Sequence, residues 1–207
     1  MVYTIEEIKK DLVQLSAEQF YTKYIVRSDN WYFENVLAKP LSEHQKLTDE
    51  YKLIVSKGLD ISINSITMVG SGKVGYSFSP TEKKLSPFND DEKVRKLSDL
   101  DIAIVSDKLF SKFWNLFRIG YKGCLDYIYK VNVFRGIYRG YINESAIELV
   151  DECRKEWNIL ISDVKKRLYE ELYIKHEIHF RLYRNWEDFE EYNLQSIKKI
   201  KEEISNV

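Results

Sequence analysis

The chain has 207 residues, a length that suits one domain with its own hydrophobic core rather than a multidomain assembly. Its 32 lysines and arginines nearly balance 33 aspartates and glutamates, which excludes a global positive field toward nucleic acid or anionic membranes. No apolar stretch is long enough to cross a bilayer, so we expect a cytoplasmic protein without membrane insertion. The two cysteines, Cys124 and Cys153, form no CxxC pair and so suggest neither a disulfide framework nor a thiolate zinc site.

An opening helical layer is predicted at the start of the chain. Three S/T-x-x-E/Q sequences begin at Thr4, Ser16 and Ser42, and each precedes helix-like spacing of apolar residues, as at a capped helix N-terminus. Residues 61–69 (ISINSITMV) then alternate and are rich in β-branched side chains. This pattern predicts a strand that ends at Gly70.

The middle of the chain is predicted to form an exposed excursion from the core, then a strand and helices. Residues 79–97 combine two prolines, an Asn-Asp-Asp run and many charges, which predicts an exposed excursion. Residues 100–105 are an apolar run that predicts a second strand. Asp107 is expected to cap one helix, and Asn143 another whose apolar pattern continues to Leu168.

The last part of the chain completes an α+β pattern. Residues 174–183 alternate and predict a late strand, after which Asn185 caps a closing amphipathic helix. The order of elements predicts an α+β (mixed α/β) fold, in which N-terminal and C-terminal helices flank a small mixed sheet. We treat the chain as a single domain, 1–207, with a helical N-terminal layer over 1–60, a strand-loop-strand core over 61–106, and helices with a later strand and a closing helix over 107–207.

Two carboxylates stand at the entrance of the second strand. In SDLDIAIV, side chains alternate between the faces of a strand, so Asp99 and Asp101 lie on one face and Leu100 on the other. Like charges so close need a neutralising partner, and two divalent ions about 3.5–4 Å apart can supply it. The alternative is a strand whose first residues place two acids in water.

A glycine-rich loop, Gly70-Ser71-Gly72-Lys73-Val74-Gly75, follows the first predicted strand. Glycines let backbone N–H groups turn toward a phosphate, and Ser71 adds a hydroxyl donor. The loop also fits the GxGxxG dinucleotide fingerprint, but that fingerprint requires an acid at the far end of the second strand, whereas here the acids stand at its start. The Walker pattern fails because Tyr76 stands where lysine is required.

Together, Gly70-Ser71, Gly75 and Ser98-Asp99-Leu100-Asp101 resemble the hG-S-x-x-x-G … [S/T]-D-h-D-h signature of DNA-polymerase-beta-like nucleotidyltransferases, over residues 61–106. The resemblance implies a sheet of that family's type and a nucleoside triphosphate donor. It also implies Mg²⁺ or Mn²⁺ ions on Asp99 and Asp101. The implied triphosphate-binding residues are Gly70 and Ser71, with Gly75, Lys73 and Ser98 as further candidates.

The resemblance also sets the expected reaction. Members of the superfamily include terminal transferases, antibiotic-modifying enzymes, minimal nucleotidyltransferase toxins and bacterial antiviral synthases of nucleotide signals. It therefore implies ATP-type donors, a nucleotide, nucleic-acid or protein hydroxyl as acceptor, and a cognate defence or toxin–antitoxin partner protein. Two alternatives stay open: a dinucleotide-binding Rossmann-like module, and a catalytically inactive nucleotide-binding protein of the same fold.

The chain departs from the family pattern in two places. The segment from Tyr76 to Leu97 is longer than usual, as a lid or an acceptor-binding insert would be. The third carboxylate of the family, normally on a later strand, is assigned to Glu177, which shares a predicted strand face with His179. We expect Glu177 to be a catalytic and metal-binding residue, with an exposed strand acid as the alternative. His176 falls on the opposite face, which argues against an HxxH zinc site.

Overall fold

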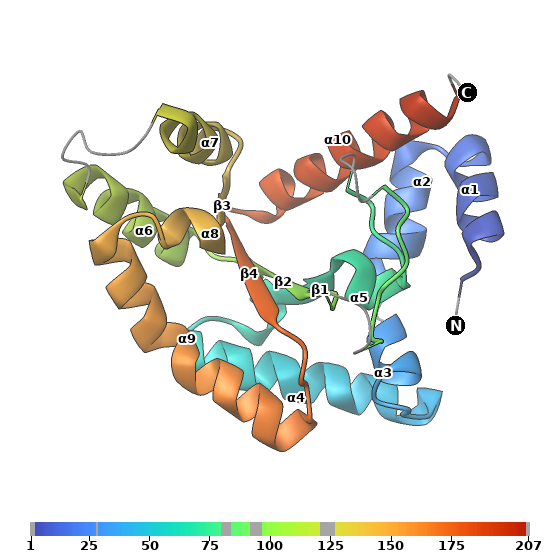
Figure 1. The fold of residues 1–207 in the computed structure, drawn as a ribbon, viewed down its shortest axis with the longest axis horizontal. Helices are drawn as coiled ribbons and strands as arrows, with labels where there is room; N and C mark the ends of the chain where they lie inside the picture. Colours follow the sequence, from blue (N-terminus) through green and yellow to red (C-terminus); the bar gives the residue numbers. More distant parts are fainter. Residues whose placement is uncertain (1–2, 28, 80–83, 92–96, 121–126, 206–207) are drawn as a thin grey trace.

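A four-stranded mixed sheet lies at the centre of the molecule, with helices on both faces (Figure 1). The structure is a computed structural model that describes residues 3–27, 29–79, 84–91, 97–120 and 127–205. The strands are β1 (Ile66–Val69), β2 (Leu100–Val105), β3 (Tyr141–Asn143) and β4 (Ile178–Tyr183). Their order is β1-β2-β4-β3, with β2 and β4 parallel and the other two pairs antiparallel. The expected α+β fold with a small mixed sheet is confirmed.

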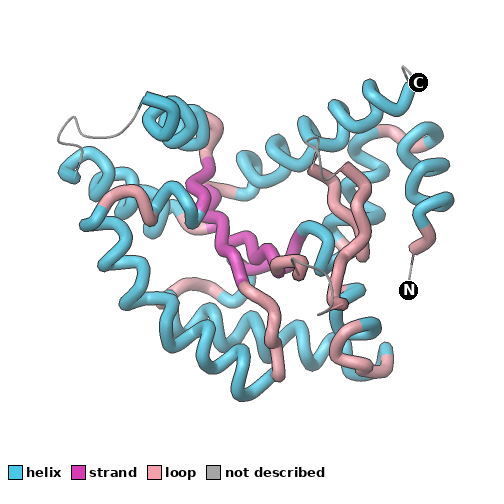
Figure 2. The backbone as a smooth tube through the Cα atoms, in the orientation of Figure 1, coloured by secondary structure: helices cyan, strands magenta, loops and turns pink. Residues whose placement is uncertain are grey.

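Helices make up most of the chain (Figure 2). In chain order the helices are α1 (Ile5–Gln14), α2 (Ala17–Tyr21), the π-helical η1 (Thr22–Val26), α3 (Trp31–Asn35), α4 (Leu41–Leu59), the 3₁₀ turn η2 (Ile63–Ser65), α5 (Gly70–Val74), α6 (Asp107–Gly120), α7 (Tyr127–Tyr138), α8 (Glu144–Ile147), α9 (Asp151–Leu172) and α10 (Trp186–Ser205). In the described part of the chain, no helix combines the length and apolarity needed to cross a membrane.

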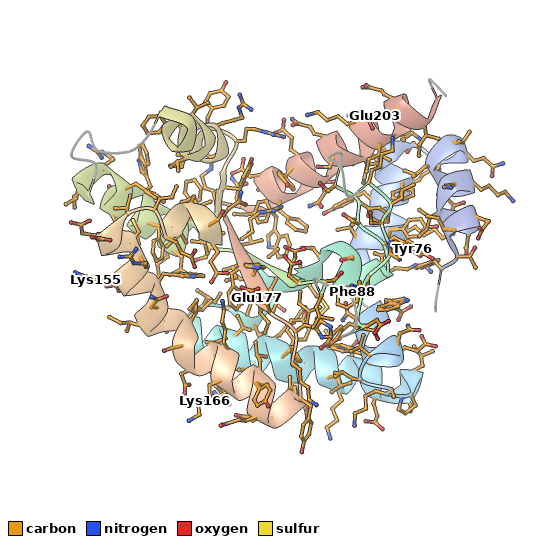
Figure 3. All side chains as sticks on the ribbon, in the orientation of Figure 1. Tyr76, Phe88, Lys155, Lys166, Glu177 and Glu203 are labelled. Atoms are coloured by element: carbon orange, nitrogen blue, oxygen red, sulfur yellow. The ribbon has the colours of Figure 1, made fainter. Side chains whose placement is uncertain are left out.

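The alternation of β2 divides the core into two layers. Leu100 and Ile102 belong to a buried cluster with residues of α4, α6 and α9. Ala103 and Val105 belong to a second cluster, on the other face, with residues of α1, α2 and α10. Charged residues on the outer face of α9, such as Lys155 and Lys166, point away from the sheet (Figure 3). The second layer shares its sheet face with the two aspartates, and this places them beside α10.

The N-terminal expectations are mostly confirmed. The side chain of Thr4 accepts from the backbone N–H of Glu7, and Ser16 forms a full capping box. The expectation for Ser42 is wrong, because α4 begins one residue earlier, at Leu41, without a side-chain cap. The first strand is shorter than predicted: the hydroxyl of Ser62 accepts a local backbone hydrogen bond that starts a 3₁₀ turn, so β1 begins only at Ile66.

The C-terminal half differs in its boundaries. The helix expected from Asn143 to Leu168 is two helices, α8 and α9, and the short strand β3 was not predicted. The late strand begins at Ile178, and Asn185 caps α10 through its side-chain oxygen, which accepts from the N–H of Asp188 at 2.8 Å. Three-residue strands such as β3 carry too little periodicity to be recognised in a sequence.

The excursion predicted for residues 79–97 is only partly exposed. Residues 80–83 and 92–96 lie outside the described residues. The described parts form a hairpin, residues 75–79 and 84–89, closed by hydrogen bonds from Ser77 N to Ser86 O and from Phe88 N to Gly75 O. Phe88 (labelled in Figure 3) is 6% exposed, and its ring packs against that of Trp31. A second aromatic side chain of the hairpin, Phe78, is 9% exposed and contacts the rings of Phe20 and Tyr24. The hairpin is held on the body of the protein because these two side chains enter the core.

Candidate functional site

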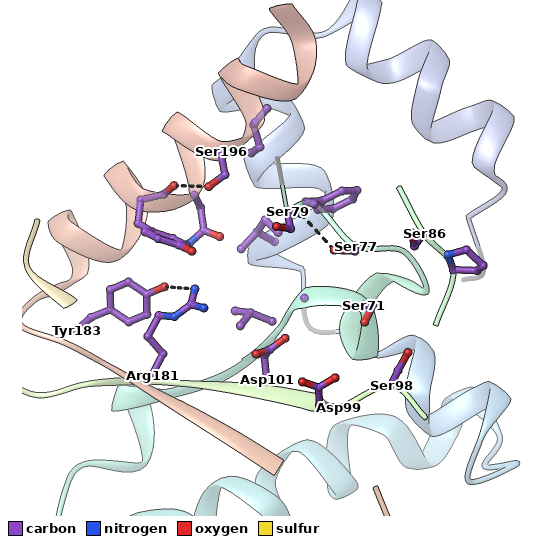
Figure 4. A pocket seen from close by; sticks show the side chains of 18 of the residues that line it. Ser71, Ser77, Ser79, Ser86, Ser98, Asp99, Asp101, Arg181, Tyr183 and Ser196 are labelled. Atoms are coloured by element: carbon purple, nitrogen blue, oxygen red, sulfur yellow. Dashed lines mark hydrogen bonds between the residues drawn. The ribbon is translucent and has the colours of Figure 1, made fainter. Parts of the chain in front are cut away.

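A cavity of about 430 Å³ lies between the aspartate face of the sheet, α10 and the hairpin (Figure 4). Its lining comes from segments far apart in the sequence. The lining residues are Gly70, Ser71, Ser98, Asp99 and Asp101 on the floor with Val69 and Leu97, Arg181 and Tyr183 from β4, Tyr192, Asn193, Ser196 and Ile197 from α10, Ile25 from η1, and Ser77, Phe78, Ser79, Ser86 and Pro87 from the hairpin.

Gly70 brings the loop against the carboxylate of Asp101. The backbone of Gly70 has φ +69°, in the left-handed region, and a Cβ atom there would lie 2.6 Å from Asp101 Oδ2. The β1–β2 register places Val69 opposite Asp101, so the chain turns into α5 directly beside this aspartate. Glycine is therefore required both for the turn and for the open space in front of the carboxylate.

The other loop candidates divide into two groups. Ser71 and Ser98 line the cavity, and the hydroxyl of Ser98 accepts a hydrogen bond from Asn89 N at 2.9 Å. Gly75 and Lys73 do not line it. Gly75, at φ +89°, ends α5, and a Cβ there would meet the ring of Trp31. Lys73 is buried, with 4% exposure, so its placement does not support the expected phosphate contact.

The direction of the strands bears on the dinucleotide alternative. A Rossmann unit joins two parallel strands through a helix of several turns. Here β1 and β2 are antiparallel, and α5 ends at Gly75 after five residues. The GxGxxG match therefore has no dinucleotide-binding unit around it.

Arg181 supplies a fixed positive charge on the cavity wall. Its Nε donates to Asn143 Oδ1 at 2.7 Å, and its guanidinium lies 4.8 Å from the ring centre of Tyr192. Burial opposes the charge, but contacts with Tyr183 and Tyr192 and the field of Asp101 outweigh it and raise the pKa of Arg181. The guanidinium and the carboxylate of Asp101 thus face the same space (Figure 4).

Glu177 lies level with Asp99, just before β4. Its backbone oxygen accepts from Leu100 N at 2.8 Å, and its side chain is 73% exposed, outside the cavity lining. Between the two acids stands His179, whose Nε2 is 3.5 Å from Asp99 Oδ2 and 3.5 Å from Glu177 Oε1. Asp99 Oδ2 and Glu177 Oε1 are therefore separated by no more than twice 3.5 Å. The role of Glu177 as the third carboxylate stays a prediction.

A buried acid behind this group, Glu144, was missed in the sequence. It is 4% exposed and accepts hydrogen bonds from Trp157 Nε1 (2.9 Å), Lys165 Nζ (2.9 Å) and Phe180 N (2.8 Å). Its Oε2 is also 3.7 Å from His179 Nδ1. No local pattern distinguishes this residue, because an acid directly after Asn143 reads as an ordinary first residue of a helix.

The donor set suits divalent cations held together with a substrate. Among the described residues, no three His, Cys, Asp or Glu side chains are grouped so that they could hold a metal ion by themselves. Mg²⁺ is commonly bound through one or two carboxylates plus substrate phosphates, so a complete protein cage is not required. Asp99 and Asp101, with the space that Gly70 leaves free, fit that arrangement.

No protein-family model, no curated protein and no solved structure matches the chain.

Lys73, a buried residue of α5, is a source of instability. Burial, together with the nearby charge of Lys52, lowers the pKa of Lys73 to about 8, although Asp29 acts in the opposite direction. Between this value and the ordinary value of 10.5, the unfolded chain binds a proton that the folded chain does not. The contribution of Lys73 to the free energy of unfolding therefore increases as the pH rises from 8, and at lower pH the buried charge is a cost.

Lys73→Met is expected to raise the free energy of unfolding at pH 7 by up to about 3 kcal/mol, because the buried charge is removed. The gain should shrink as the pH rises above 8. Denaturant unfolding of both proteins at pH 7 and 9.5 measures it, with the exposed Lys57→Met as control. A destabilised Lys73→Met protein, or a gain that is independent of pH, would show that the lysine is not neutralised by burial.

Proposed function

We propose that this protein is a metal-dependent nucleotidyltransferase, which transfers a nucleoside monophosphate from a nucleoside triphosphate to a hydroxyl acceptor. The observation that carries the proposal is the floor of the cavity. There Asp99 and Asp101 stand side by side against Gly70 and Ser71, and Arg181 faces the same space from β4. Carboxylates for cations, a glycine turn and a fixed guanidinium are the groups that nucleotidyl transfer needs, because the protein mainly positions reactants and neutralises charge.

The protein groups act on the triphosphate from two sides. The Ser71 hydroxyl and the open backbone at Gly70 approach the phosphates from the floor, and Arg181 approaches from the wall. Two cations held by Asp99 and Asp101 would make an acceptor hydroxyl more acidic and offset the charge of the phosphates. Because Asn143 and Tyr192 fix the guanidinium, its charge is in place before a nucleotide binds.

The hairpin contributes a cover over the same space. Ser77, Ser79 and Ser86 line the cavity together with the largely buried Phe78. A cover of this kind limits the access of water, which would otherwise compete with the acceptor hydroxyl. The family resemblance left the segment from Tyr76 to Leu97 as a lid or an acceptor-binding insert; in this proposal its described residues 76–79 and 84–89 serve as the cover.

The proposal is tested by incubating the purified protein with each labelled ribo- and deoxyribonucleoside triphosphate and Mg²⁺ or Mn²⁺. We expect pyrophosphate release and a product whose mass is increased by one or more nucleoside monophosphates, which names the donor and the acceptor. Binding without pyrophosphate release under all conditions would instead favour the inactive nucleotide-binding protein.

A further prediction concerns Glu177. If its carboxylate accepts the proton of the attacking hydroxyl, Glu177→Gln should lower turnover by about 100-fold or more with little change in nucleotide affinity, since that interaction matters chiefly in the transition state. Turnover and triphosphate affinity are measured separately, and the exposed Glu170→Gln on α9 serves as control. Ordinary turnover in the Glu177→Gln protein would leave a two-aspartate site.

A further inference from the structure

The wall of the cavity formed by α10 carries two polar side chains, Asn193 and Ser196. The side-chain nitrogen of Asn193 donates to Phe189 O at 2.8 Å, and the hydroxyl of Ser196 donates to Tyr192 O at 3.0 Å (Figure 4). Both carbonyl oxygens can only accept, so the orientation of the Asn193 amide and of the hydroxyl hydrogen follows from the helix itself. Each side chain has thus directed a donor toward its own backbone.

What remains on this wall is mainly acceptors. Asn193 keeps its carbonyl oxygen Oδ1 and one of its two amide N–H donors, and Ser196 keeps the lone pairs of Oγ. Within the part of the chain that the structure describes, no donor is placed on either oxygen. Residues three apart share one face of a helix, so both acceptors front the cavity together.

These acceptors cannot receive the phosphates. Phosphate oxygens are themselves acceptors, and the groups that suit them, Ser71 and Arg181, lie on the floor and on the β4 wall. The lining also includes three apolar side chains of the buried cluster to which α10 belongs, Ile25, Phe78 and Ile197. A flat apolar ring with N–H groups at its edge is the part of a nucleotide that matches this combination.

We propose that the α10 wall is the subsite for the donor base, and that it takes a base with an exocyclic amino group, as in adenine or cytosine. This inference rests on the proposed function. An amino group has two N–H donors for the two oxygens of Asn193 and Ser196, whereas a keto oxygen at the same place would leave both acceptors unpaired. Sites built around such hydrogen bonds reject analogues that lack them.

The test compares nucleotides that differ at this one position. Calorimetry with the whole protein, with Ca²⁺ in place of Mg²⁺ to slow transfer, gives the affinities for ATP and ITP, and for CTP and UTP. We expect the amino form to bind at least about tenfold more tightly in each pair. Asn193→Leu should bring both ratios close to one while ITP and UTP bind as before, and Ser196→Ala should lower the ratios. Lys198→Leu, on the exposed face of the same helix, should keep the wild-type ratios.

Equal affinity for ATP and ITP in the wild-type protein would overturn the base assignment and leave the proposed function standing. A loss of affinity for deoxy-ATP, with ITP bound as tightly as ATP, would instead place the ribose on the α10 wall and also overturn it. Failure of all four triphosphates to bind would overturn the proposed function together with the inference.

Discussion

Replacing Asp99 and Asp101 together by asparagine is expected to abolish nucleotide transfer, with a fall in turnover of at least about 1000-fold. Both side chains stand on the cavity floor, and asparagine keeps their shape while removing the charge that would hold the cations. Pyrophosphate release by the double variant is the measurement. Wild-type turnover would remove the basis for the metal assignment.

The same variant has an expected effect on stability. Two carboxylates on one strand face repel each other in the absence of cations, so the double variant should unfold at the same temperature as the wild type or at a higher one. Mg²⁺ should raise the melting temperature of the wild type but not that of the double variant. The control is the exposed Asp163→Asn on α9, which should keep the Mg²⁺ response. A Mg²⁺-dependent rise retained in the double variant would place the cations elsewhere.

Glu144→Leu is expected to lower the free energy of unfolding by about 3–5 kcal/mol, the range for breaking a buried charged network by removing one partner. The substitution leaves Lys165, the indole N–H of Trp157 and the backbone N–H of Phe180 without their acceptor. Because Phe180 lies in β4, the loss affects the strand that carries Arg181.

Denaturant unfolding measures the loss in the free energy of unfolding, and two further variants serve as comparisons. Glu144→Gln retains one acceptor oxygen for some of the donors, and its free energy of unfolding should lie between those of the wild type and Glu144→Leu. Glu148→Leu, four residues further along and exposed, should change the free energy of unfolding by less than about 0.5 kcal/mol. A loss below about 1 kcal/mol for Glu144→Leu would mean that water replaces the carboxylate.

The features that could be predicted from the sequence are those with local causes. The strand from Leu100 to Val105 was predicted with its observed bounds, because its apolar run and the alternation around the aspartates lie within a few residues. The caps at Thr4, Ser16 and Asn185 likewise depend on contacts across three residues. That Asp99 and Asp101 line one cavity with Ser71 agrees with the expected spacing of the motifs.

The features that could not be predicted depend on the register between distant strands. Arg181 reaches the cavity because β4 pairs in parallel with β2, with Asp101 opposite His179. Glu144 is buried because β3 returns beside β4 and places it against α9. The segment after Gly75 contributes two aromatic side chains to the core, Phe78 and Phe88. Composition alone cannot show which aromatic side chains of a polar segment are buried.

The order of the strands has a consequence for the synthesis of the protein. β2 carries the aspartates, but its second neighbour, β4, and the α10 wall follow more than seventy residues later in the chain. A nascent chain that has emerged only as far as α9 has the floor of the cavity without Arg181, Tyr192 or Asn193. Such an intermediate cannot hold a nucleotide in the proposed way, so a chain still being translated, or one cut between α9 and β4, is expected to be inert toward the cell's nucleotides.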